Sequence, residues 1–398
     1  MSYQFDSVED VVNALKRGEM VVVTDDESRE NEGDLIGAAA KATPEMVTFM
    51  VSHARGLLCV PLSTECADKL GLVNMSSAAD PFRTAFTQSV DVIEGTTTGI
   101  SAFDRAKTIA ALIDPESRLN DFASPGHVFP LIAKSGGVLQ RAGHTETAVD
   151  LARLAGLAPA GVICEIMNDD GSMSRVPELD VFRRKFGLKW CTVASLIEYR
   201  RRTENLVEKG EFANLPTEYG NFKICGFRSK IDGLEHVALI YGDVKGQEGV
   251  LTRVHSECLT GDVFASCRCD CGNQLHDAMK KIVEEGAGII VYMRQEGRGI
   301  GIFNKINAYQ LQDQGCDTVE ANERLGFSDD LREYGIGVQI ILALGVKSIR
   351  VLTNNPRKII GLNGYGLEIV GRVPLMSEYH KLACQYMQTK KEKMGHLI

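Results

Sequence analysis

Four of the chain's eleven cysteines lie close together in the stretch CLTGDVFASCRCDCG, which begins at residue 258. Cys258, Cys267, Cys269 and Cys271 offer soft thiolates, which suit zinc. A zinc ribbon needs two C-x2-C pairs, whereas this cluster reads C-x8-C-x-C-x-C. The spacing leaves two alternatives about equally favoured: a closed four-thiolate structural site, or a catalytic site with three thiolates and a water.

Arginines and glycines near the cluster favour the catalytic alternative. RVHSE (253–257) directly precedes it, and RQEGRGIG (294–301) follows an apolar strand pattern. Glycines beside Arg294 and Arg298 at a strand end indicate an anion-binding loop, although a glycine-rich loop alone is more often an ordinary turn. NKIN (304–307) resembles a guanine-reading motif without its aspartate and is taken as chance.

Two further segments add polar groups. DDLREYG contributes Asp330 and Arg332, and LTNNPRK contributes Thr353 and Lys358 at a strand end. Each segment alone is most simply a solvated helix face or a loop. Beside a thiolate zinc, the same groups suggest an anionic substrate that is attacked by metal-bound water.

The first half has its own concentration of ionisable groups, DDESRENEGDL (25–35). Six of its eleven residues are carboxylates, and Arg29 lies among them. Most acidic runs are solvated loops. This run directly follows the apolar strand pattern MVVVT (20–24), which places it at a strand end, where sites tend to form. Its hard oxygen ligands favour Mg²⁺ or Mn²⁺ over zinc.

His127 in GHVFPL and His144 in RAGHTETAV are two of only eight histidines, and each follows a glycine. A lone histidine more often has a structural role. Arg141 and the helix expected to begin near Thr145 would bind an anion through their donors and the helix dipole. Glu165 lies in an apolar strand pattern, and a buried acid needs a partner or a chemical purpose.

Composition and length bound the class of protein. The chain has 398 residues, 44% hydrophobic and 24% charged, which predicts a soluble protein of two domains. Residues 1–199 carry 18 basic and 28 acidic side chains, and residues 200–398 carry 26 and 25. Neither half has the basic surplus of an extended nucleic-acid surface. The acidic start, the short apolar runs and the odd, irregularly spaced cysteines predict a cytoplasmic protein that binds no membrane.

The expected fold class is a two-domain α/β (α+β) protein with its boundary near residue 200. In the first domain a helix is predicted over 6–18, ended by Gly18, and another over 145–157 with Thr145 as N-cap. The second domain alternates strand patterns with helical ones, as α/β domains do. Its expected strands are 222–228, 236–243, 287–293 and 348–355, and its expected helices are 274–286 and 330–346. The polar tail after about residue 385 is expected to be partly disordered.

The motifs of the second half resemble GTP cyclohydrolase II. RVHSECLTGDVF, RCDCG, YMRQEGRGIG, LGFSDDLREYGIG and LTNNPRK carry the resemblance and span nearly all of 205–375. That family opens the imidazole ring of GTP, releasing formate and pyrophosphate and leaving a diaminopyrimidine for riboflavin synthesis. The resemblance implies one Zn²⁺ in this domain, held by Cys258, Cys269 and Cys271 with water as the fourth ligand, and leaves Cys267 outside the ligand set.

The same resemblance implies which residues meet GTP. Asp330 would accept a proton. Arg332 is the family's proposed nucleophile toward the α-phosphate, although a guanidinium with a pKa above ~12 more easily stabilises the charge of the departing pyrophosphate. The implied GTP contacts are Arg253, Val254, His255, Ser256, Glu257, Gln274, Glu296, Gly297, Arg298, Thr318, Thr353 and Lys358.

The motifs of the first half resemble 3,4-dihydroxy-2-butanone 4-phosphate synthase. DDESRENEGDL, TAFTQSVD, TTTGISAFDRAKTI, GHVFPL, RAGHTETAVDLARLAGL and GVICEIMNDDGSM carry this resemblance over about 20–175. That family converts ribulose 5-phosphate to the butanone phosphate and formate with two divalent ions, Mg²⁺ or Mn²⁺. The resemblance implies metal contacts by Glu30 and His144, and a homodimer with the site near the subunit interface.

The synthase reaction needs enolisation, a carbon-skeleton shift and loss of formate, so protons must move. Asp34, His127 and Glu165 are the candidates for these transfers. Cys59 in LLCVPL is either a substrate contact or a buried apolar side chain. The substrate contacts that the resemblance implies are Arg29, Glu30, Asp34, Arg141, Ala142, Gly143, His144, Thr145 and Glu165.

Together the two resemblances imply a bifunctional riboflavin biosynthesis enzyme. A mixed-sheet synthase domain would occupy 1–199, and an α/β zinc-dependent GTP cyclohydrolase II domain 200–398. The expected partners are GTP, ribulose 5-phosphate and a second copy of the chain, without nucleic acid or membrane. One alternative leaves one half active and makes the other an oligomerisation scaffold; another makes the second half a zinc-bearing nucleic-acid module. Every motif position is filled in both halves, which favours two active enzymes. The second half lacks a basic surplus and paired C-x2-C motifs, which argues against a nucleic-acid module.

Overall fold

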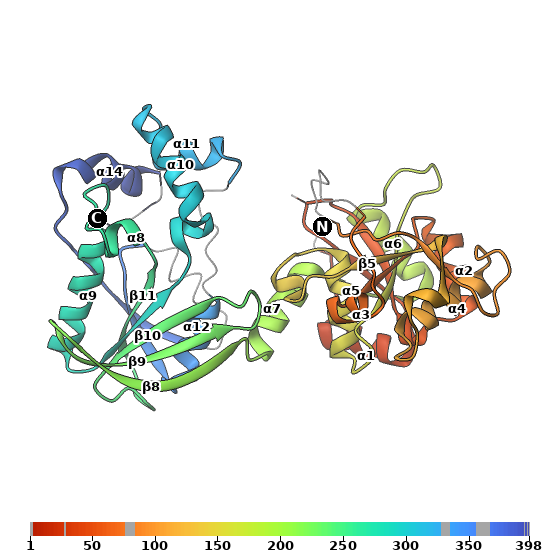
Figure 1. Ribbon diagram of the computed structural model, residues 1–398, viewed down its shortest axis with the longest axis horizontal. Coiled ribbons are helices and arrows are strands. Elements are labelled where there is room, and N and C mark those ends of the chain that lie inside the picture. Colours follow the sequence, from red (N-terminus) through yellow and green to blue (C-terminus); the bar gives the residue numbers. More distant parts are fainter. Residues whose placement is uncertain are drawn as a thin grey trace. The chain divides into compact units, whose positions relative to one another are not determined.

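The computed structural model describes residues 3–27, 29–75, 84–327, 335–355 and 367–393, together with 395 and 397. The chain divides into two compact units, Met1–Arg200 and Arg201–Ile398. Each is built on a seven-stranded sheet with helices packed against it (Figure 1). This arrangement confirms the expected two-domain α/β fold class.

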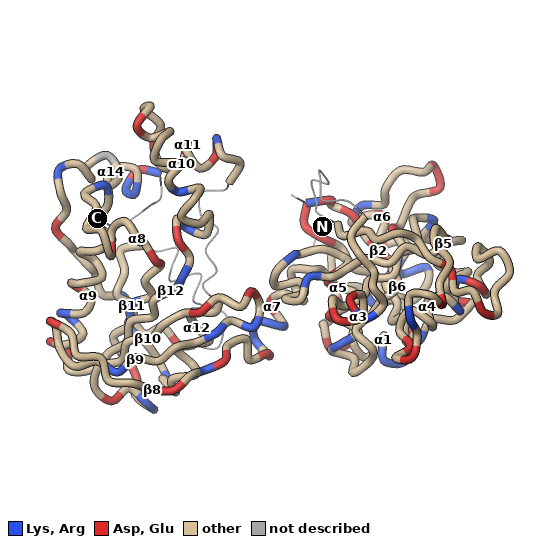
Figure 2. The backbone as a smooth tube through the Cα atoms, in the orientation of Figure 1, with Lys and Arg blue, Asp and Glu red and all other residues tan. Residues whose placement is uncertain are grey.

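Charge and hydropathy are distributed without long blocks. Figure 2 shows Lys and Arg interspersed with Asp and Glu along both units, rather than gathered in one basic stripe on the residues drawn in colour. In the described ranges, no helix has both the length and the apolar character needed to cross a bilayer.

The sheet of the first unit is mixed. Its strand order is β4-β5-β3-β6-β2-β1-β7. The β1–β7 and β3–β5 pairs run parallel, and the other four pairs run antiparallel. The strands are β1 (Val21–Thr24), β2 (Gly33–Ala38), β3 (Cys59–Leu62), β4 (Val90–Val92), β5 (Phe122–Ile132), β6 (Gly161–Glu165) and β7 (Lys189–Thr192).

Helices cover both faces of this sheet, because side chains alternate along each strand. The helices are α1 (Val8–Arg17), α2 (Pro44–Phe49), α3 (Thr64–Lys69), α4 (Ala102–Ile113), α5 (His144–Leu154), α6 (Val176–Phe186) and α7 (Val193–Thr203), with short 3-10 or π turns at Ala39–Lys41, Met50–Ala54, Leu119–Asp121 and Gly137–Leu139. Val22 packs in one apolar cluster with Ile109 of α4 and Leu179 of α6. Its neighbour Val21 packs in another with Leu151 of α5.

The two helices expected in the first unit are present, with one difference. α1 begins after Ser7 and ends at Gly18, whose φ of 87° is left-handed. α5 has Gly143 rather than Thr145 as its N-cap, so the expected cap is wrong. The helix starts earlier because His144 must turn inward in the first turn, where its Nε2 lies 3.2 Å from the carbonyl oxygen of Val23.

The second unit has the strand order β14-β13-β11-β12-β10-β9-β8. The β8–β9, β9–β10 and β10–β12 pairs are antiparallel. The β12–β11, β11–β13 and β13–β14 pairs are parallel. The strands are β8 (Val207–Thr217), β9 (Gly220–Ser229), β10 (Glu235–Tyr241), β11 (Val250–Ser256), β12 (Gly288–Met293), β13 (Ser348–Leu352) and β14 (Glu368–Val373).

The parallel strands bring two predicted loops to one edge. Ser256 at the end of β11 pairs with Met293 at the end of β12, so the cysteine loop and the RQEGRG loop begin side by side. The helices that follow are α8 (Leu259–Asp262), α9 (Cys271–Glu285), α10 (Gly301–Asp313), α11 (Thr318–Arg324), α12 (Gly335–Ala343) and α14 (Cys384–Glu392), with 3-10 turns η5 (Glu296–Gly299) and η6 (Lys381–Ala383).

The carboxyl-terminal tail folds, so the expected disorder after residue 385 is wrong for most of it. α14 covers Cys384–Glu392. Its Lys390 is buried and forms an ion pair with Asp270, and Lys393 forms ion pairs with Asp317 and Glu320. The partners of these lysines lie far away in the sequence, which is why the polar tail alone gave no sign of them.

Candidate functional sites

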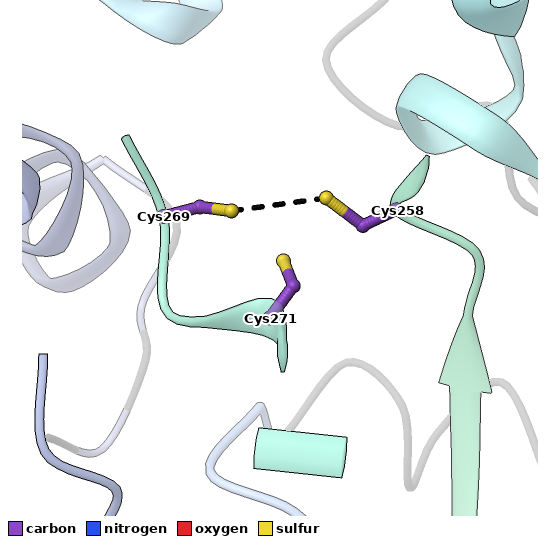
Figure 3. Close-up of side chains that lie close together, drawn as sticks. All are labelled: Cys258, Cys269 and Cys271. Atoms are coloured by element: carbon purple, nitrogen blue, oxygen red, sulfur yellow. Dashed lines mark hydrogen bonds between the residues drawn. The ribbon is translucent and has the colours of Figure 1, made fainter. Parts of the chain in front are cut away.

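Three of the four clustered cysteines converge at the carboxyl edge of the parallel strands (Figure 3). Cys258 lies two residues after β11, and Cys271 opens α9. The sulfur atoms of Cys258, Cys269 and Cys271 all lie within 4.8 Å of one another. Cys267 is exposed and stands outside this group. The donor set is therefore three soft thiolates, which fits zinc with one position left for a further ligand.

A glycine makes room for the thiolates. A Cβ on Gly261 would lie 2.9 Å from the sulfur of Cys269 and 3.1 Å from that of Cys258. Both distances are tighter than ordinary contact between these atoms. Any larger residue at 261 would push apart the ligands that the metal has to bring together.

Cys258 is held from several sides. Its backbone N donates to Asp262 at 3.0 Å, and Asp262 also accepts from Tyr292 at 2.8 Å and lies 3.1 Å from Nε2 of His255. The ammonium of Lys305 lies 3.1 Å from the sulfur of Cys258. Such outer contacts orient a metal ligand before the metal binds.

These contacts also set the ionisation of the thiols. Hydrogen bonds from Cys269 and Cys271, together with the charge of Lys305, hold the pKa of Cys258 far below its ordinary value. The shared hydrogen bond with Cys258 raises the pKa of Cys269 to about 11. Although burial opposes it, the Cys258 thiolate and Glu296 raise the pKa of Lys305 well above its ordinary value. The neighbouring thiols and Lys305 therefore favour the thiolate form of Cys258.

A cavity opens beside the thiolates, and half of the predicted GTP contacts line it. Gly297 and Arg298 of η5 both adopt left-handed backbone conformations, with φ of 61° and 63°. For Arg298 this conformation is locally strained, as is common at functional sites. The predicted residues that line the cavity are Ser256, Glu257, Glu296, Gly297, Arg298 and Thr318.

Other predicted contacts lie deeper, away from the cavity wall. Arg253 is buried in β11, where its guanidinium donates to the carbonyl of Leu352 at 2.9 Å and to Gln274 at 2.6 Å. Buried positions are also occupied by Val254, His255 and Thr353. Asp330, Arg332 and Lys358 lie outside the described residues.

The cavity is also lined by residues that the sequence did not single out, namely Arg268, Lys305, Tyr309 and Tyr386. Lys305 and Tyr309 are four residues apart on α10 and so share one helix face. The four-residue spacing of Lys305 and Tyr309, directly after the RQEGRG loop, could have indicated that both side chains face the cavity. Tyr386 comes from the folded tail, where no pattern pointed to it.

In the first unit, Asp25, Glu30 and His144 form a second ligand group, with ligand atoms within 4.8 Å of one another. The two carboxylates come from the loop between β1 and β2, and His144 from the first turn of α5. Arg29 lies 3.0 Å from Asp25 and 2.7 Å from Glu30. Oxygen and imidazole donors fit Mg²⁺ or Mn²⁺. Glu30 and His144 were predicted as metal ligands, whereas Asp25, which lies in the same acidic run as Glu30, was not.

Two predicted proton-transfer residues meet beside this group. Asp34 in β2 is the cross-strand partner of Glu165 in β6. Glu165 accepts from the backbone N of Leu57 at 2.8 Å. Oδ1 of Asp34 is buried without a hydrogen-bond partner among the described residues, and it lies 3.6 Å from Nδ1 of His144.

Burial raises the pKa of Asp34 to about 7. Burial opposes protonation of His144, but the charges of Asp34 and Glu30 outweigh it and raise the pKa of the imidazole to about 9. Asp34 can therefore gain or lose a proton near neutral pH, which suits a general acid or base.

Arg141 lies at the start of α5, where an anion site is predicted. The Arg141 guanidinium donates to Glu146 at 2.6 Å and to Thr84 at 2.8 Å. A Cβ on Gly143 would lie 2.5 Å from Nη1 of Arg141 and 3.1 Å from Nη2 of Arg29. Glycine therefore lets both guanidinium groups approach the helix N-terminus, where an anion is favoured. Of the other predicted contacts here, Thr145 is buried and Ala142 is exposed.

His127 lies apart from this group within the chain. Its Nδ1 is 2.6 Å from Asp91, and its backbone N donates to the same carboxylate at 2.9 Å. Strand β3 separates β5, which carries His127, from β6, which carries Glu165. Cys59 is 1% exposed in β3, and burial raises the pKa of its thiol well above the ordinary value.

Comparisons with known proteins assign each of the two units to a family. A family model for 3,4-dihydroxy-2-butanone 4-phosphate synthase matches residues 9–199, and one for GTP cyclohydrolase II matches residues 208–374. "Riboflavin biosynthesis protein RibBA" of Bacillus subtilis is 57% identical over 396 residues, covering 99% of each chain. The chain belongs to the RibBA family of bifunctional riboflavin biosynthesis proteins. The protein of the same name from Bacillus mycoides is 56% identical over 395 residues, again with 99% of each chain covered.

A solved structure has the same two-domain fold. RibBX from A. baumannii, described as a two-domain 3,4-dihydroxy-2-butanone 4-phosphate synthase, matches with a TM-score of 0.70 and 36% identity, covering 92% of this chain and 99% of that one. A crystal structure of a 3,4-dihydroxy-2-butanone 4-phosphate synthase in complex with two magnesium ions is 47% identical, covering 50% of this chain and 98% of that one, with a TM-score of 0.48. RibBA membership confirms the expected bifunctional enzyme, and the alternative of a single active half gains no support.

Proposed function

We propose that the first domain converts D-ribulose 5-phosphate to 3,4-dihydroxy-2-butanone 4-phosphate and formate. We propose that the second hydrolyses GTP to 2,5-diamino-6-(5-phosphoribosylamino)pyrimidin-4(3H)-one, formate and pyrophosphate. The observation that carries the proposal is that each unit gathers its own ligand group, one of hard donors and one of thiolates. RibBA membership supplies the two reactions that these donor sets fit.

In the synthase domain, Glu30 and His144 would hold the divalent ions, and Asp25 joins them as a ligand. Two Mg²⁺ or Mn²⁺ ions would stabilise the negative charge of each enediolate. Asp34 and Glu165 would move protons on the substrate, since they are cross-strand neighbours beside the ligand group.

The phosphate of ribulose 5-phosphate would bind at the positive end of the synthase site. Arg29, Arg141 and the backbone from Gly143 to Thr145 are its proposed contacts, and Ala142 lies among them. His127 would also take part in proton transfer. Because the chain does not place His127 beside Glu165, this role fits a homodimer in which subunits meet near the site.

In the cyclohydrolase domain, Cys258, Cys269 and Cys271 would hold zinc. A zinc ion held there would supply hydroxide at neutral pH, because a zinc-bound water has a pKa of ~7. Arg298 reaches the cavity from the glycine-rich turn and would bind the triphosphate. Asp330 would accept a proton, and Arg332 would stabilise the departing pyrophosphate.

Some of the remaining proposed GTP contacts lie on the cavity wall and would touch the nucleotide directly: Ser256, Glu257, Glu296, Gly297 and Thr318. Others are buried and would shape the site from behind: Arg253, Val254, His255 and Thr353. The set is completed by Gln274, which accepts from Arg253, and by Lys358, which lies outside the described residues. We place the domain boundary at 199/200. A cytoplasmic location suits the eleven free cysteines, which a reducing compartment would preserve.

Formate release tests both activities in the full-length chain. The wild type should release formate from ribulose 5-phosphate with Mg²⁺, and separately from GTP with zinc. Glu165→Ala should lose only the first activity, and Cys269→Ser only the second, so each variant is the folded control for the other. A wild type that releases no formate from one of the two substrates would overturn the bifunctional proposal.

A further inference from the structure

Lys305 places a buried cation against one of the three thiolates. It lies in α10, shortly after the η5 turn, and its side chain is 12% exposed. Its ammonium is 3.1 Å from the sulfur of Cys258 and 2.7 Å from Oε1 of Glu296. The ring of Tyr309 lies 5.8 Å from the same ammonium. This environment is too enclosed for a lysine that serves only solubility.

Glu296 extends this contact to the backbone of the cysteine loop. Its second oxygen, Oε2, accepts from the backbone N of Leu259 at 2.6 Å, and the residue is 8% exposed. Leu259 directly follows Cys258. Lys305 therefore holds Cys258 twice: through the sulfur itself, and through Glu296 and the next peptide.

The charge of the ligand set makes such a cation useful. Three thiolates carry one more negative charge than a divalent cation neutralises. A thiolate that accepts an N–H hydrogen bond gives less electron density to its metal, so the metal keeps more positive charge. The effect is larger in an enclosed site than in water. Without Lys305, the anions Cys258 and Glu296 would face each other with no positive charge between them.

We propose that Lys305 is a positioning residue of the cyclohydrolase site: its ammonium donates to the Cys258 thiolate while the metal is bound, offsets the excess charge of the three thiolates, and fixes Glu296 against the cysteine loop. The role rests on the proposed hydrolysis of GTP. It differs from a substrate contact, because Lys305 acts through Cys258 and Glu296.

Cobalt(II) substitution of the full-length protein tests this role without any substrate. In Lys305→Met, the near-ultraviolet thiolate-to-cobalt band should move to longer wavelength, because the sulfur lone pair loses its hydrogen bond. Lys305→Arg keeps a donor and should return the band toward the wild-type position. Lys280→Met is the matched control, since Lys280 is exposed on α9 and forms an ion pair with Asp277, away from the three cysteines of the ligand group; its band should not move.

The zinc-loaded variants give the kinetic counterpart. A lost charge-assisted hydrogen bond predicts that kcat for GTP falls about tenfold or more in Lys305→Met. KM should change much less, because a residue that acts through the ligands has little effect on binding of GTP. An unmoved cobalt band with wild-type kcat in Lys305→Met would overturn the proposal, as would a defect confined to KM.

If Lys305→Met fails to bind cobalt, a double variant tests the proposal instead. The double variant Lys305→Met/Glu296→Gln removes both opposite charges, so it should bind cobalt again while keeping the displaced band. A double variant that still binds no cobalt, or that has the wild-type band, would overturn the proposal. Failure of the proposed function is separate, since it would show as no formate from GTP in the wild type, whatever the cobalt band does.

Discussion

Replacing Lys390 with methionine should loosen the loop that carries two of the three thiolates. Lys390 lies in α14 and is 6% exposed, and its ammonium pairs with Oδ1 of Asp270, which is 2% exposed. Asp270 stands between Cys269 and Cys271 in the chain. Methionine retains the apolar stem and removes only the charge.

The size of the effect follows from burial. Breaking a buried ion pair by removing one partner costs about 3–5 kcal/mol, because the remaining charge stays in a poorly polarisable interior. Asp270 keeps one side-chain partner, since Gln274 still donates to its Oδ2 at 2.6 Å. We therefore expect the lower end, about 3 kcal/mol, which makes local opening of the loop about a hundredfold more frequent.

Hydrogen exchange in the full-length protein measures this opening. Amides of the first turns of α9 should exchange about a hundredfold faster in Lys390→Met. The first unit supplies an internal reference, because Trp190, the only tryptophan of the chain, lies in it. Unfolding followed by tryptophan fluorescence should be the same in variant and wild type.

Two further variants test whether the buried pair of Lys390 and Asp270 holds the loop. Lys393→Met removes a lysine that is 45% exposed from the same tail, and an exposed pair contributes about 0–1 kcal/mol. Lys390→Met/Asp270→Asn removes both charges of the buried pair and should recover most of the protection. Equal exchange in Lys390→Met and Lys393→Met would show that the buried pair does not hold the loop.

Three other outcomes are expected. Cys267→Ser should bind one zinc per chain and hydrolyse GTP normally, whereas Cys269→Ser should lose both, as measured by metal analysis and formate release. Dialysis against EDTA should abolish formate release from ribulose 5-phosphate, and Mg²⁺ or Mn²⁺ alone should restore it. His236→Asn should make the stability of the second unit less dependent on pH below about 6.5. In the wild type, buried His236 accepts the backbone N–H of Arg294 at 3.1 Å.

The sign of the pH effect follows from burial, which lowers the pKa of His236 below its ordinary value. A histidine held neutral in the folded state contributes stability that is fully present above the unfolded pKa and is lost as the pH falls through the folded pKa. Asparagine keeps an acceptor and does not titrate. Parallel pH profiles of stability for the wild type and His236→Asn would contradict this account. Loss of zinc in Cys267→Ser would restore the four-thiolate alternative. Full synthase activity after dialysis against EDTA would contradict the divalent-ion site.

Local patterns predicted the elements well where burial agreed with them. Val21, Val22 and Val23 are all buried, so the strand pattern was unambiguous. Gly18 ended its helix as expected because only its left-handed conformation closes the turn. Thr145 had the side chain of an N-cap, but the inward turn of His144 moved the helix start, which is a tertiary effect that local pattern does not contain.

Site residues could be predicted only where a recognisable motif contained them. Spacing alone could not separate Cys267 from the other three cysteines, since all four lie within one short loop. Asp25 was hidden among equivalent carboxylates, and only the fold shows that it faces His144. Lys305 offered a helical spacing to Tyr309, but its partner Cys258 lies 47 residues away. Contacts over such distances are set by the parallel strands, which local patterns do not register.

The folded tail lies outside both family-model matches, although the RibBA relatives cover 99% of the chain. The GTP cyclohydrolase II match ends at residue 374, yet α14 begins ten residues later and supplies Tyr386 to the cavity wall and Lys390 to Asp270. The two lysines that touch the thiolate region therefore differ in origin. Lys305 comes from inside the matched region and reaches the sulfur of Cys258, whereas Lys390 comes from outside it and reaches the carboxylate of Asp270, the residue between Cys269 and Cys271. Because the first acts on charge at the ligand and the second on the stability of the loop, Lys305→Met should alter the cobalt band without faster exchange in α9, and Lys390→Met should do the reverse.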